Sequence, residues 1–190
     1  MNLLKILYII GIFFLAGCST MQSSGTHAPS VSMQKYSTIA VAKFVSPVPA
    51  VGDRVAARLV IRLAADGYTV ANLENLKKLS GIEILTSPEL TPADKAVMAA
   101  NGINAVLYGT IDRYECKTLK EWTWTGFAPE KTENELCHAS LSVKIVDAAT
   151  GDTVWQSKED YSHKDIDMTA RMALERVLTR IEDEIPKINN

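Results

Sequence analysis

The sequence predicts an α/β domain in which helices pack on a mixed sheet. Three observations support this fold class. Segments with the apolar spacing of strands and of helices alternate between residues 36 and 111. Apolar and polar residues alternate over Leu141–Val146, and a compact turn and a second strand-like run follow, as in an antiparallel hairpin. The chain closes with an amphipathic helical pattern over 167–185.

The first half begins with a strand and a helix. A run rich in β-branched and aromatic residues over 36–44 predicts a strand that ends at Pro47 and Pro49. Apolar side chains at helical spacing then predict a helix that starts at Gly52-Asp53 and stops at Gly67. The apolar stripe of this helix consists of Val55, Ala56, Leu59, Val60 and Leu63.

Two further strands and two further helices follow. Tyr68–Val70 is a candidate strand, and Asn72 caps a short helix that ends near Gly81. The segment 82–85 is ambiguous. Thr91 and Pro92 begin another helix, which Asn101-Gly102 closes before an apolar strand over 105–111.

The pattern changes after the segment 112–138. Leu141–Val146 and 153–157 should pair as an antiparallel hairpin around the turn Asp147–Asp152. Aspartates that flank such a turn commonly accept hydrogen bonds from their own backbone. The final helix carries six apolar side chains on one face, and Pro186 ends it.

The first 18 residues resemble a bacterial lipoprotein signal. A basic Lys5 precedes an apolar stretch that ends in Leu15-Ala16-Gly17-Cys18. We therefore expect residues 1–17 to be removed as a signal peptide and the thiol of Cys18 to carry a covalent lipid such as palmitate. Ser19 stands where an aspartate would favour retention at the inner membrane. This predicts anchoring at the periplasmic face of the outer membrane.

Residues 18–35 indicate a flexible tether, and residues 36–190 a single periplasmic domain. The tether is rich in Ser, Thr, Gln, Gly, Pro and His, and would average about 20–25 Å end to end as a coil. Without residues 1–17 the chain keeps 19 basic against 22 acidic side chains, a net charge of −3. This balance does not indicate a nucleic-acid partner.

The two remaining cysteines, Cys116 and Cys137, predict a disulfide in an oxidising compartment. Closing a loop of about 20 residues should stabilise the fold by about 3 kcal/mol in the chain-entropy model. Two separately buried thiols are the alternative. A metal site is a further alternative, although His138 beside Cys137 lacks the paired spacing of a tetrahedral zinc site.

Two segments carry a resemblance to a known family. Ser142–Trp155 resembles a signature of the CsgG-like lipoproteins: a valine-rich strand, Asp-x-x-Thr-Gly and a strand with Trp. Asn104–Ile111 is similar to a buried strand of that superfamily that ends in a glycine. The superfamily includes the curli secretion channel subunit, lipoprotein activators of penicillin-binding proteins and the amino-terminal domain of the TolB propeller protein.

The resemblance covers about residues 36–185. It implies a three-layer domain that binds other envelope proteins and has no known catalytic residues or cofactor. An oligomeric part of a secretion apparatus similar to the curli channel is the second function that it implies. A channel subunit of that type inserts long amphipathic hairpins into the outer membrane, and a transmembrane strand needs about 9–11 residues of alternating character. Neither 45–52 nor 112–138 supplies two such strands.

The segment 121–127 contains the strongest candidate for partner binding. Trp122 and Trp124 share one face if the segment is extended, and Phe127 follows them. These rings either form an exposed contact site or fold back over the sheet as a lid on the core.

A second candidate is a basic helix face. Arg54, Arg58 and Arg62 lie four residues apart and would form a positive ridge opposite the apolar stripe. The ridge could hold an acidic partner or lipid head groups. It could equally be a solvated face, with Asp66 one turn beyond Arg62.

The sequence favours a binding protein over an enzyme. His27, His138 and His163 do not cluster, and the catalytic motifs of serine hydrolases, nucleotide-binding loops and zinc peptidases are absent from the sequence. The prediction is a lipid-anchored envelope accessory protein whose partner the sequence does not name, with a homo-oligomer as a further arrangement. A cell-wall hydrolase is the third function considered.

Overall fold

The computed structural model describes residues 32–80, 85, 89–124 and 126–188. Its five strands form one mixed sheet in the order β2-β1-β3-β4-β5. The strands are β1 (Thr38–Val41), β2 (Thr69–Ala71), β3 (Ala105–Trp124), β4 (Pro129–Asp147) and β5 (Thr153–Asp165). β1 pairs in parallel with β2 and β3, and β3-β4-β5 is an antiparallel meander.

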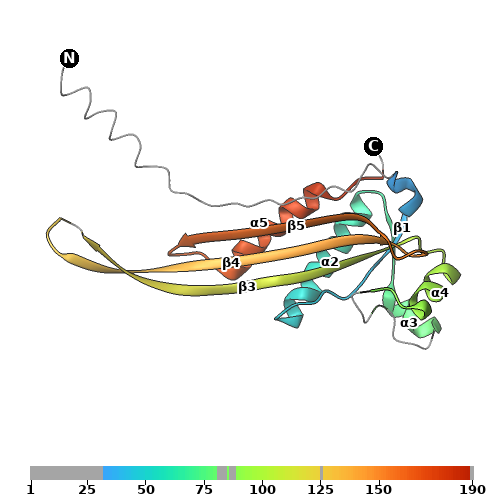
Figure 1. Cartoon of the computed structure of the whole chain (residues 1–190), viewed down its shortest axis with the longest axis horizontal. Helices are drawn as coiled ribbons and strands as arrows, with labels where there is room; N and C mark the ends of the chain where they lie inside the picture. The colour runs from blue at the N-terminus through green and yellow to red at the C-terminus, as the bar shows by residue number, and fades with distance from the viewer. Residues whose placement is uncertain (1–31, 81–84, 86–88, 125, 189–190) are drawn as a thin grey trace, which may run out of the picture.

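Helices cover both faces of the sheet, so the predicted fold class is confirmed (Figure 1). The longer helices α2 (Pro49–Ala65) and α5 (Ala170–Glu184) pack on one face. The shorter helices α3 (Leu73–Ser80) and α4 (Pro92–Ala100) lie on the other face. A 3-10 turn, η1 (Met33–Tyr36), precedes β1 and buries Met33 and Tyr36.

Each strand near the centre of the sheet contributes side chains to a core on each face, because successive side chains point to opposite faces. Ala105, Leu107 and Ile111 of β3 pack toward α2 and α5. Val106 and Tyr108 pack toward α3 and α4. The sheet is therefore buried on both sides at this point, as the apolar run over 105–111 indicates.

Most helix ends follow the sequence signals. Thr91 and Asp94 form a reciprocal capping box at the start of α4, and Asn72 Oδ1 accepts a hydrogen bond from the N–H of Asn75. The predicted start of α2 at Gly52 is wrong, because the helix begins three residues earlier. Pro49 occupies its first position, where the fixed φ of proline suits a helix.

The strands predicted over 105–111 and 141–146 are too short, because most of the segment 112–138 is also strand. These residues continue β3 and begin β4, so the strands are 20 and 19 residues long. Beyond the body of the sheet, the helices that the structure describes cover neither face of the two strands. The apolar alternation that reveals a half-buried strand is therefore weak there.

The β3–β4 ladder shifts between Ile111 and Arg113, which makes Asp112 a β-bulge. The Asp112 carboxylate accepts a hydrogen bond from Ser142 Oγ at 2.8 Å and lies 3.4 Å from Lys158 Nζ. Polar side chains of two neighbouring strands thus hold the extra residue in place.

Candidate functional site

The β3–β4 hairpin extends far beyond β5 and the labelled helices (Figure 1). β5 accompanies it only as far as the pair Glu135–Asp165, and β1 pairs only with the first residues of β3. The remaining part of the hairpin is a two-stranded ribbon. Such a ribbon is marginally stable alone, so it needs bracing from its own cross-links.

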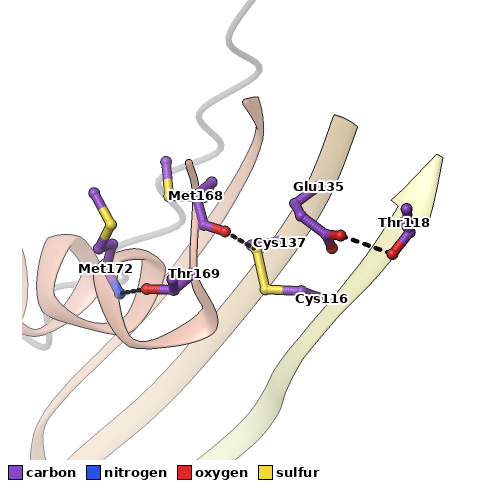
Figure 2. Close-up of a disulfide and its surroundings, with 7 residues drawn as sticks. All are labelled: Cys116, Thr118, Glu135, Cys137, Met168, Thr169 and Met172. Carbon is purple, nitrogen blue, oxygen red and sulfur yellow. Dashed lines mark hydrogen bonds between the residues drawn. A yellow bond between two sulfur atoms is a disulfide. The ribbon is translucent and has the colours of Figure 1, made fainter. Parts of the chain in front are cut away.

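The disulfide between Cys116 and Cys137 supplies this brace and confirms the predicted pairing (Figure 2). The two residues are directly opposed across β3 and β4, with their Cα atoms 4.0 Å apart. Cys137 is fully buried, and its Sγ lies 3.3 Å from the carbonyl oxygen of Met168, just before α5. The brace therefore joins the root of the ribbon and contacts the α5 side of the body.

Polar cross-strand pairs continue the bracing toward the tip. Thr118 Oγ1 donates to Glu135 at 2.7 Å (Figure 2). Lys120 Nζ lies 3.8 Å from Glu133 Oε1, and the hydroxyl oxygens of Thr123 and Thr132 are 3.3 Å apart. Each exposed pair contributes little, but together they favour one register of the ribbon.

Three aromatic side chains project into solvent at the end of the ribbon. Trp122 is 72% exposed, Trp124 71% and Phe127 99%. We call these three residues the aromatic tip. The lid interpretation is wrong, because all three rings are exposed and none covers the core.

The arginine ridge on α2 is largely neutralised. Arg58 Nε and Nη2 donate to the two carboxylate oxygens of Glu182 on α5, at 2.6 and 2.7 Å, and Arg58 also pairs with Glu175. The bonds to Glu182 raise the pKa of Arg58 above its ordinary value. Arg62 pairs with Asp66 at 2.8 Å. The solvated-ridge interpretation therefore fails at Arg58, which joins two helices.

Arg54, the third residue of the ridge, lies at a pocket between α2, α5 and β3. The pocket has a volume of about 100 Å³, and its walls are apolar: Val51, Val55, Leu174, Leu178 and the ring of Tyr114. We call it the α2–α5 pocket. Arg54, Arg58, Arg171 and Glu175 complete its lining. Within the part of the chain that the structure describes, Arg54 and Arg171 form no ion pair.

A buried carboxylate closes the β4–β5 turn. Burial would raise the pKa of Asp147, but hydrogen bonds from Lys35, the N–H groups of Thr150 and Ala149, and Tyr36 lower it to about 2. The bonds to residues 149 and 150 confirm that Asp147 bonds its own turn. They indicate a structural role for this carboxylate.

The other candidate residues do not come together. His138 and His163 lie on adjacent strands, and no group of three metal-ligating side chains occurs among the described residues. Cys18 and His27 lie outside those residues. Between Ser32 and Ile188, no described helix has the length and apolar character to cross a bilayer.

Comparison with known proteins adds evidence on the fold alone. No family model and no curated protein sequence matches the chain. The PelC dodecamer of Paraburkholderia phytofirmans aligns over 85% of this chain and 94% of its own, at 13% identity and a TM-score of 0.51. The likeness to PelC indicates a shared fold. The resemblance to CsgG-like lipoproteins stays a prediction.

Two further solved structures are similar at lower TM-scores. Lipoprotein GNA1162 of Neisseria meningitidis aligns over 78% of this chain and 99% of its own, at 17% identity and a TM-score of 0.49. The LpoB C-terminal domain of Salmonella enterica aligns over 70% and 86%, at 15% identity and a TM-score of 0.46.

Sequence reasoning missed the long ribbon and the α2–α5 pocket. One signal for the ribbon was present, since Cys116 and Cys137 are equally distant from Gly126-Phe127. A disulfide centred on a turn glycine indicates opposed strands. The pocket has no comparable signal, because it joins residues of α2 and α5 that are more than 100 positions apart.

Proposed function

We propose that the chain is a lipid-anchored accessory protein of a bacterial cell envelope that acts by binding and not by catalysis. In this proposal Cys18 holds it at the periplasmic face of the outer membrane, and the hairpin presents the aromatic tip to an envelope protein. The leader ending at Cys18 and the following Ser19 support the location. The aromatic tip is the observation that carries the binding role.

Large rings that face solvent have an energetic cost that binding would remove. Aromatic side chains are also the residues that most often dominate binding energy at protein interfaces. The segment Trp122–Pro129 contains no charged residue, so its contact with a partner requires no charge to be desolvated. The disulfide at the root fixes the ribbon before binding, which reduces the entropy lost in the complex.

Crosslinking in intact cells tests the binding role. A photoreactive amino acid at position 124 should crosslink the chain to a defined envelope protein. The same group at Ile61, which is exposed on α2, is the matched control and should not. A Trp122→Ala/Trp124→Ala variant should lose the partners that the wild type retains. Identical crosslinks from both positions, or unchanged partners of the double variant, would contradict the role of the tip.

Acylation tests the location separately. Labelled palmitate should enter the wild type and the Cys116→Ser/Cys137→Ser variant, but not Cys18→Ser. The Cys18→Ser chain should also leave the membrane fraction or keep its unprocessed size. A Cys18→Ser protein that pellets with membranes at its processed size would contradict the anchor.

An oligomeric component of an outer-membrane secretion apparatus is the second candidate function. Two observations favour it: the fold shared with PelC, which is a dodecamer, and a β3–β4 hairpin that is much longer than expected. The mass of the detergent-extracted protein separates the candidates. A ring of many copies favours the apparatus, and a monomer or dimer favours the adaptor.

A further inference from the structure

The aromatic tip and the α2–α5 pocket are chemically complementary surfaces on the same chain. The pocket walls are apolar, and its volume is about 100 Å³. An apolar cavity of about 150 Å³ holds a whole benzene, so this smaller pocket suits the edge of one aromatic ring. Phe127, at the outermost turn of the hairpin, presents a single ring that is almost entirely exposed.

Charges at the two surfaces are complementary as well. Arg58 is neutralised by Glu182 and Glu175, but Arg54 and Arg171 have no carboxylate partner within the described residues. Glu130 follows the aromatic tip on β4 and likewise has no ion pair among the described residues. Guanidinium groups also stack favourably on aromatic faces, which favours the rings of the tip over an aliphatic ligand.

A chain cannot make this contact with itself. The hairpin leads away from α2 and α5, and its strands stay paired to the tip (Figure 1). The pocket, by contrast, lies over Tyr114, close to the root of the ribbon. The tip that fills the pocket must therefore come from another molecule.

We propose that the α2–α5 pocket binds the aromatic tip of a second copy of this chain, with Phe127 between the apolar walls and Glu130 facing Arg54 and Arg171. This inference rests on the proposed role of the tip as a contact site and names a second copy as its partner, an arrangement that corresponds to the second candidate function, the oligomeric apparatus. The two surfaces differ, so the interface is heterologous. Each added copy leaves one free tip and one free pocket, and assembly continues until a ring closes.

Mixing two variants tests the contact on the full-length chain in detergent. A tip variant, Phe127→Ser, and a rim variant, Arg54→Glu/Arg171→Glu, should each weaken self-association at least about tenfold. An equal mixture should form a pair of one copy of each, and nothing larger. In this mixture only the intact pocket of the tip variant and the intact tip of the rim variant can still bind each other.

The controls match both changes at sites away from the contact. Ile61→Ser removes an exposed apolar side chain from α2, and Arg176→Glu reverses an exposed charge on α5. Both should keep the wild-type mass by light scattering. Circular dichroism checks folding, and Phe127→Ala with Arg171→Ala replaces any variant that fails to fold.

Three results would overturn the proposal: a wild type that stays monomeric at its highest soluble concentration, variants that associate like the wild type, or a mixture that stays monomeric. Crosslinking from position 124 to another envelope protein separates the two hypotheses. If that crosslink forms while the wild type is monomeric, the proposed function stands and this inference fails. If the copies pair as described but the tip never crosslinks to another envelope protein, this inference stands and the proposed function fails.

Discussion

Gly109 and Phe44 illustrate how closely single residues fit in the larger core. A Cβ atom built on Gly109 would lie 1.8 Å from Cε1 of Phe44, far inside van der Waals contact. Phe44 is itself buried among the residues under α2. The absence of a side chain at position 109 is what lets this ring cross the central strand.

Gly109→Ala should therefore lower the free energy of unfolding by about 1–3 kcal/mol, as overpacking of a core does. Urea unfolding measures the loss. Combining it with Phe44→Val removes the clashing ring, so the double variant should be less destabilised than the sum of the two single variants. Strict additivity would show that the ring of Phe44 is not what excludes a side chain at position 109.

Asp147 makes stability depend on acidity. Its folded pKa of about 2 lies below the ordinary 3.8, so the unfolded chain binds this proton more readily. The contribution is complete above pH 3.8 and is lost as the pH falls through about 2. The difference corresponds to about 2 kcal/mol.

Asp147→Asn should make the free energy of unfolding depend less on pH in this acidic range. Urea midpoints at several pH values between 5 and 2 should fall with acidity in the wild type and change less in the variant. Asp152→Asn is the control, since its side chain is exposed at the same turn. Equal slopes in wild type and Asp147→Asn would contradict the assignment.

Sequence reasoning works for residues when their partners are local. The bond from Asp147 to its own turn follows from the spacing of the Asp-x-x-Thr-Gly turn. Its bonds to Lys35 and Tyr36 span more than 100 residues and depend on how η1 crosses the end of β4. Only the folded chain reveals them.

At the scale of elements, Arg58 connects the two helices of one layer. It bonds both carboxylate oxygens of Glu182, which is nearly buried. Arg58→Met should lower the free energy of unfolding by about 1–3 kcal/mol, because it leaves a buried carboxylate without its partner. Thermal unfolding measures the loss, which Glu182→Gln in the same chain should reduce. Arg176→Met, at an exposed position on α5, should change little, and an equal effect of both would contradict the coupling.

The disulfide stabilises the whole fold and the ribbon in particular. Cys116→Ser/Cys137→Ser should lower the free energy of unfolding by about 3 kcal/mol in the chain-entropy model. Amide hydrogen exchange should show the largest loss of protection in the ribbon on the tip side of the cysteines, and a smaller loss over 105–111. Equal loss in both regions would mean that the cross-link does not specifically brace the ribbon.

The elements that sequence reasoning located have a buried face. The helices α2, α4 and α5 and the central strands show apolar periodicity because one side of each contacts the core. The outer parts of β3 and β4 have solvent on both faces, so their apolar and polar residues do not alternate in a way that indicates a strand. Their pairing, the disulfide and the polar pairs hold them as strands.

Over the whole molecule, stability and the proposed contact site lie in different places. The core is concentrated around α2, α5 and the centre of the sheet, whereas the aromatic tip contacts none of it. Replacing Trp122, Trp124 and Phe127 together by Ser should therefore change the free energy of unfolding by less than about 0.5 kcal/mol. Urea unfolding measures this, and a loss of several kcal/mol would show that the rings support the fold.

The layered architecture was predictable because strand and helix patterns alternate along the chain. The packing between distant segments was not. Tyr68 Oη donates to the carbonyl of Pro186, and the N–H of Ile188 donates to that of Asp66. These bonds join residues 186 and 188 to the turn after α2, and no local sequence pattern predicts them.

The bulge at Asp112 determines the direction in which the outer hairpin presents its side chains. Before it, odd-numbered residues of β3 face α2 and α5; after it, even-numbered residues such as Tyr114 and Cys116 do. The extra residue in β3 thus exchanges the faces to which odd- and even-numbered side chains point in the rest of the strand. If Asp112 instead continued the regular ladder, Cys116 would lie opposite Leu136 on the other face, and both tryptophans would project from the opposite side of the hairpin. Deleting Asp112 itself would remove the bulge but leave Cys116 opposite Cys137, so the tip would keep its orientation.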